Sequence, residues 1–186
     1  SGTLDNSGDI TVAGDRAVGL SAYGNGHVVE NTGLISATGL EVWALVLSAE
    51  NSEVSNHGII NAMGTSSRAV FATGSEVCVN NASRGPIFAE GEGAHAMSLA
   101  GTGNRLSNEG RIEARGESVI AVNTEGYELT VTNLAGGGMC RPQRPPSTPE
   151  RGPVRTHRAF FLRHPRTSLN AASGSVNRNR YPAAKA

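Results

Sequence analysis

The chain has 186 residues, in which 16 basic and 16 acidic side chains balance. It holds 24 glycines and its aromatic content is 4%, which argues against an ordinary globular core and favours short strands joined by tight turns. No stretch reaches the roughly 18–20 apolar residues that a membrane-spanning helix needs. The chain begins at Ser1 with no export signal, so we expect a fragment or a processed product.

The balanced charge averages two unlike parts. Residues 1–138 carry 6 Arg and 15 acidic residues, a net charge of −9, and hold all but two of the 24 glycines. Residues 139–186 carry 9 Arg, 1 Lys and 1 acidic residue, a net charge of +9, and hold all but one of the 8 prolines. We therefore expect a repeat domain over residues 1–138 and an Arg/Pro-rich tail over residues 139–186.

The first part repeats the word Asn-x-Gly-x-Ile-x-x-x-Gly. The first glycine of each copy follows the previous one by 25, 25, 27 and 25 residues, at Gly8, Gly33, Gly58, Gly85 and Gly110. A sixth copy begins at Asn133 and stops in the glycines 136–138. Spacing this regular indicates a stack of repeated structural units.

Apolar residues also recur at fixed slots of each repeat. The slot two residues before the Asn holds Val29, Val54, Val79, Leu106 and Val131, and the slot eleven before it holds Leu20, Leu45, Val70, Met97 and Val122. Within a segment the fixed slots lie two residues apart with variable residues between them, which is typical of strands and not of helices. Each repeat then supplies about three short strands that bury their apolar side only by stacking on the next repeat.

The sequence therefore predicts an all-β fold, a single-stranded parallel β-helix of about five 25-residue turns, followed by an irregular or disordered C-terminal tail. The repeated Asn predicts a ladder of side-chain amides that bond from turn to turn. The two extra residues of the fourth copy should loop out among Ala82, Ser83 and Arg84, so that Val79 stays stacked on its neighbours.

The repeated Asn-x-Gly-x-Ile with its trailing Val-x-Asn, over about residues 4–136, resembles the passenger region of bacterial autotransporters (type V secretion), of the pertactin-like and adhesin-like class. The resemblance implies a right-handed coil, exported through the periplasm and held on the bacterial cell surface or released from it. It implies a structural stalk or adhesin whose partners are a host-surface protein, a glycan or another copy. Membrane association is expected only through a barrel domain that this chain does not contain.

Two other functions stay open. A β-helical enzyme that degrades polysaccharides needs acids clustered across adjacent turns in one groove. A module of a repetitive surface or phage fibre should form trimers.

The tail has three interpretations. It is a basic arm for nucleic acid or anionic lipid, a disordered linker, or an out-of-frame translation of a G+C-rich gene, which is typically rich in Arg, Pro, Ala and Ser. We favour the last, because the repeat stops in mid-word. We expect no nucleic-acid partner, because the basic residues are dispersed and few aromatic residues accompany them.

The sequence predicts no catalytic residue, metal site or cofactor. His27, His57 and His95 occupy different slots without metal-ligand spacing, and Cys78 and Cys140 are not expected to form a disulfide. Acidic residues fall in variable slots that should face solvent, namely Asp9, Glu41, Glu53, Glu76, Glu90 and Glu113.

One set of residues is a candidate for partner contact. Phe71 lies in an outward slot, and Trp43 and Phe88 lie elsewhere on the same central repeats. Exposed aromatic side chains often anchor a partner. The alternative for Trp43 is that it folds inward at a turn.

Overall fold

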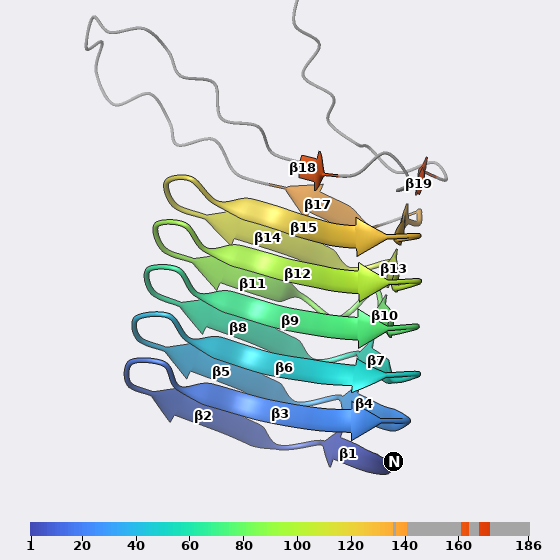
Figure 1. The fold of residues 1–186 in the computed structure, drawn as a ribbon. Helices are drawn as coiled ribbons and strands as arrows, with labels where there is room; N and C mark the ends of the chain where they lie inside the picture. Colours follow the sequence, from blue (N-terminus) through green and yellow to red (C-terminus); the bar gives the residue numbers. More distant parts are fainter. Residues whose placement is uncertain (136, 141–160, 164–167, 172–186) are drawn as a thin grey trace, which may run out of the picture.

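The chain coils through three parallel sheets, which a computed structural model describes for residues 1–135, 137–140, 161–163 and 168–171. Each strand pairs with the strand three further along the chain, so one turn contributes one strand to every sheet (Figure 1). In Figure 1 the front strands run from left to right while the chain rises, which makes the coil right-handed. The predicted β-helix of about five turns is confirmed.

The three sheets are called A, B and C here. Sheet A contains β1 (Gly2–Asn6), β4 (His27–Asn31), β7 (Glu53–Asn56), β10 (Cys78–Asn81), β13 (Arg105–Asn108), β16 (Thr130–Asn133) and β19 (Ser168–Ala171). Sheet B contains β2 (Asp9–Ala13), β5 (Leu34–Thr38), β8 (Ile59–Met63), β11 (Ile87–Glu90), β14 (Arg111–Arg115) and β17 (Gly138–Cys140). Sheet C contains β3 (Val18–Asn25), β6 (Trp43–Glu50), β9 (Arg68–Ser75), β12 (His95–Thr102), β15 (Ile120–Tyr127) and β18 (Phe161–Arg163).

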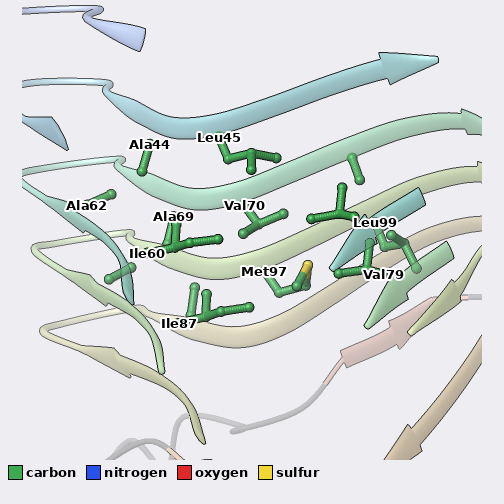
Figure 2. Close-up of a cluster of buried hydrophobic side chains, with 14 of the residues drawn as sticks. Ala44, Leu45, Ile60, Ala62, Ala69, Val70, Val79, Ile87, Met97 and Leu99 are labelled. Atoms are coloured by element: carbon green, nitrogen blue, oxygen red, sulfur yellow. The ribbon is translucent and has the colours of Figure 1, made fainter. Parts of the chain in front are cut away.

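The core is a set of stacked columns of apolar side chains between the three sheets. Leu45, Val70 and Met97 pair in register on successive turns and are fully buried, as the sequence predicts (Figure 2). Alternation along a strand separates the two faces sharply, because Ile60 is 0% exposed whereas its neighbour Ile59 is 46% exposed. The fixed slots of the repeat are therefore the inward ones.

The alternation breaks where each strand of sheet C begins. Ala44 and Leu45 are consecutive and both fully buried, and the pairing between β6 and β9 passes from Trp43–Arg68 directly to Leu45–Val70. The same small residue stands inward on the other central turns, at Ala69, Ala96 and Ala121. A strict two-residue period misses this alanine column, because the chain bends there and presents two successive side chains to the core.

From the second repeat word on, the glycine that ends the word is required by close stacking. Gly64 has φ 137°, and a Cβ added to it would clash with the carbonyl oxygen of Gly39 in the turn below. Gly91 has φ 140° and meets Gly64 in the same way. Only glycine combines this backbone conformation with such a close approach.

The predicted amide ladder runs through the rod beside sheet A. Each Asn donates from Nδ2 to Oδ1 of the Asn one turn further on, at distances of 2.8, 2.8, 2.9, 2.7 and 2.8 Å from Asn6 to Asn133. Asn31, Asn56 and Asn108 are fully buried. Because each amide serves as both donor and acceptor, the ladder satisfies polar groups that the core would otherwise leave unpaired.

Replacing Asn81 by Ala should destabilise the rod strongly. It leaves the Nδ2 of Asn56 and the Oδ1 of Asn108 buried without their partners, at a cost of about 3 kcal/mol in the free energy of unfolding. Asn80→Ala is the matched control, because the neighbouring Asn80 is exposed and bonds only Glu53 at 2.7 Å; it should cost about 0.5 kcal/mol or less. Urea denaturation measures both, and equal losses would contradict the ladder's role.

The two extra residues of the fourth repeat loop out, as predicted. Ser83 and Arg84 are exposed and lie in a turn in which the amide of Gly85 donates to the carbonyl of Ala82 at 2.9 Å. Val79 stays in register, paired with Val54 below and Leu106 above. The insertion therefore changes the corner of the turn and leaves the core columns continuous.

Deleting Ser83 and Arg84 should leave the fold intact, because it restores the uninterrupted Asn-x-Gly-x-Ile spacing of the other repeats. Thermal denaturation should give a melting temperature within about 4 °C of the full chain, which corresponds to less than about 1 kcal/mol. Deleting Asn61 and Ala62 from β8 is the control, because it removes one buried slot and shifts the register of a central strand. If the variant without Ser83 and Arg84 lost its cooperative unfolding transition, the loop would be necessary for the fold.

Three short strands follow the fifth turn. Residues Gly138–Cys140 pair with β14, Phe161–Arg163 with β15, and Ser168–Ala171 with β16. Met139 continues the isoleucine column above Ile112, and the separation of four residues from Asn133 to Gly137 repeats the one from Asn81 to Gly85. The repeated word itself ends in the glycines 136–138, because Met139 does not match its Ile. The predicted character of the rest of the tail lies outside the described residues.

Candidate functional site

A hollow of about 400 Å³ lies on the outer face of sheet C, the face toward the viewer in Figure 1. Three successive strands line it, with Val18 and Tyr23 from β3, Trp43, Val46 and Ser48 from β6, and Arg68 and Phe71 from β9. Parallel register sets these side chains beside one another, because Trp43 pairs with Arg68 and Val46 with Phe71. The lining of the hollow is mainly apolar, with Arg68, Ser48 and Tyr23 as its polar members.

The structure brings two of the three candidate contact residues together. Trp43 and Phe71 line the same hollow, and Trp43 lies half-buried on the outer face instead of turning into the core. Phe88 belongs to β11 and faces outward from sheet B, in a different hollow of about 310 Å³. Val46, which pairs with Phe71 in the neighbouring strand, also lines the hollow and is only 8% exposed.

Sequence reasoning missed the charged part of this surface. Arg68 lies over the ring of Phe71, with 5.9 Å from its guanidinium carbon to the ring centroid. His95 occupies the next turn of the same column and its Nδ1 lies 3.1 Å from the hydroxyl of Ser98. Burial lowers the pKa of the His95 imidazole from its ordinary value of 6.5, and the positive charge of Arg68 lowers it further. These outward slots hold residues that vary from repeat to repeat, so the sequence did not indicate that Arg68, Phe71 and His95 lie together.

The lowered pKa makes the stability of the rod depend on pH. Below about pH 6.5 the unfolded chain binds a proton at residue 95 more readily than the folded chain does, so His95 lowers the free energy of unfolding as the pH falls. Replacing His95 by Asn should therefore reduce the loss of stability between about pH 7.5 and pH 5.5.

Urea midpoints at the two pH values measure this effect. The remaining histidines contribute equally to both proteins, so the difference between variant and parent isolates residue 95. An acid-induced loss as large in the variant as in the parent would contradict the assignment.

One predicted surface acid is buried, which corrects the expectation that Glu113 is solvated. Glu113 is 2% exposed on the outer face of sheet B, and its two carboxylate oxygens pair with Arg111 at 2.5 Å and Arg115 at 2.7 Å. Arg115 also lies over the ring of Phe88, 5.1 Å from the centroid. Two long side chains from the same strand shield the carboxylate, an effect that a slot pattern does not reveal.

The other acids of that set lie at or near the surface. Glu41 is half-buried and pairs with Arg16 at 3.1 Å, Glu53 accepts a hydrogen bond from Asn80, and the rest are exposed at Asp9, Glu76 and Glu90. No group of three or more metal-binding side chains occurs in the part of the chain that the structure describes. The Cys78 thiol is free and half-buried, and the side chain of Cys140 lies outside the described residues.

Within the described ranges, His27 and His57 do not lie in a cluster of polar or charged side chains like the one around His95. His57 is exposed, and Nε2 of His27 lies 2.8 Å from the carbonyl oxygen of Tyr23. Nor do the described residues include a helix with the length and apolarity to cross a membrane.

Comparison of the chain with protein-family models, with curated proteins and with solved structures finds no match.

Proposed function

We propose that this chain is part of the passenger region of a bacterial autotransporter, where it serves as a stalk that carries an adhesive surface. The observation that carries the proposal is the separation of roles between the two faces of each strand. Inward slots repeat a narrow set of residues, as at Leu45, Val70 and Met97, and outward slots on the same strands differ from turn to turn. Surface residues can therefore change without cost to the core, which suits a display scaffold.

The folding requirements of the rod also support export in an unfolded form. Each turn pairs only with the turns directly below and above it, so the turns can form one after another as the chain emerges. The free thiol of Cys78 needs no partner, and the amide ladder replaces any need for a metal or disulfide clamp within the described turns.

The adhesive part of the proposal rests on the hollow in sheet C. Trp43 and Phe71 present aromatic surface on a rigid sheet, and rigid aromatic side chains lose little conformational entropy when a partner binds. The enzyme alternative needs acids that are free to act in one groove, whereas Glu113, the buried acid among the predicted surface set, has both carboxylate oxygens engaged by arginines.

Surface display tests the proposal. The full chain, carrying an N-terminal epitope tag and fused to an established surface-display translocator, should become accessible to antibody on intact cells of a Gram-negative host. The described turns should resist added protease. The control is Val70→Asp, which places a charge in the fully buried column and should abolish protease resistance. A tag that stays inaccessible, or a parent chain degraded as fast as the control, would refute the role as a displayed stalk.

Adhesion is measured on the same cells. Cells that display the parent chain should attach to glycan-coated or host-cell surfaces more strongly than cells that display Trp43→Ser/Phe71→Ser, whose two changes lie on the outer face. Phe88→Ser, on the other face, is the matched control. Equal attachment of all three would contradict an adhesive role for sheet C while leaving the stalk role intact.

A further inference from the structure

The hollow on sheet C contains one cation whose charge the rod does not neutralise. Within the described residues Arg68 contacts the ring of Phe71 but no carboxylate. Arg16, Arg111 and Arg115 are each held in ion pairs. Arg84 and Arg105 are exposed to solvent, whereas Arg68 is half-buried among apolar side chains. A partly desolvated guanidinium gains more from an anionic ligand than one in open water.

The surroundings of Arg68 define the rest of the ligand. Trp43 and Phe71 offer apolar ring surface, and the nearly buried Val46, which pairs with Phe71, adds apolar lining. Ser48 and Tyr23, whose side chains carry hydroxyl groups, also line the hollow. A matching ligand has a flat face of C–H groups, polar edges and one negative charge. A sugar ring that carries a carboxylate has this combination.

The charge of the rod favours a single carboxylate over a polyanion. Residues 1–138 have a net charge of −9, and this overall negative charge of the rod disfavours a ligand with many negative charges. A peptide fits less well, because extended peptides bind sheets by pairing with a free strand edge. The hollow lies instead on the face of three strands, β3, β6 and β9, that are paired with one another.

We propose that this hollow binds an acidic sugar residue, with its carboxylate on the guanidinium of Arg68 and its ring against Trp43 and Phe71. The proposal rests on the adhesive role proposed above and names the class of ligand for that surface. The planar guanidinium can meet a carboxylate through two parallel hydrogen bonds, which a lysine ammonium cannot do.

Trp43 provides a direct readout, because it is the one tryptophan of the 186-residue chain and it lines the hollow. The purified full chain is titrated with cellobiouronic acid and with cellobiose, which differ only by the carboxylate on one ring. The acidic disaccharide should change the tryptophan emission in a saturable way, with a Kd at least tenfold lower than that of the neutral one. Added salt should weaken the acidic ligand selectively.

Variants locate the interaction. Arg68→Gln should raise the Kd for cellobiouronic acid at least tenfold, to that of cellobiose, and leave cellobiose binding unchanged. Arg105→Gln is the matched control, because Arg105 is an exposed arginine on sheet A, and it should have no effect. Phe71→Ala should weaken both ligands. The urea midpoint of each variant shows whether it is folded. The comparison of the two sugars is made on the parent chain, so it stays valid even if a variant does not fold.

Several outcomes would overturn the inference. They are a parent chain with no saturable response, equal affinity for the two sugars, an unchanged affinity in Arg68→Gln, or equally tight binding of a short acidic peptide such as Ala-Glu-Ala. These measurements use purified protein and are independent of display. Attachment of displaying cells without a fluorescence response would reject the sugar and keep the adhesive role, and the reverse result would reject the displayed role and keep the sugar site.

Discussion

Register between parallel turns is the constraint on which the rest of this rod depends. Parallel strands about 4.8 Å apart place equivalent residues directly above one another, so one inward slot becomes a continuous column of side chains. The column of Leu45, Val70 and Met97 stays fully buried because each member sits on the one below. The amide ladder follows the same rule, since Asn56 and Asn81 can bond at 2.9 Å only when their turns are in register. A slip of one residue would expose the column and break the ladder together.

The same constraint explains which irregularities the fold accepts. Extra residues are accommodated at Ser83 and Arg84 because they lie at a corner, where the chain passes from sheet A to sheet B without a ladder to interrupt. The two inward residues at Ala44 and Leu45 lie at the start of β6, just after the corner between sheets B and C, and alanine is small enough to share the core with its neighbour. Corners therefore absorb variation that the strands cannot.

Most of the inner half of the structure could be predicted from the sequence, with the alanine column of Ala44 as the exception, whereas the outer half could not. Repetition reports inward slots directly, because stacking forces them to be alike, so the columns, the ladder and the loop at Arg84 followed from spacing alone. Outward slots carry no such repetition. The burial of Glu113 depends on the reach of Arg111 and Arg115, and the grouping of Trp43 with Phe71 depends on which sheet each faces. The place of Met139 in the isoleucine column was not predicted, because methionine does not match the repeated Asn-x-Gly-x-Ile motif.

The outer face becomes uneven where side chains of different size stand in neighbouring columns. In sheet C the small Ser48 and the large Trp43 and Phe71 line the same surface, so a flat sheet acquires a hollow bounded by aromatic rings. Its extent along the rod is set by the number of turns that contribute, here three. A substitution in one outward slot changes the shape of such a site while the column behind it stays closed. A stack of turns with constant inner faces can therefore carry binding sites at positions that the fold itself leaves unspecified.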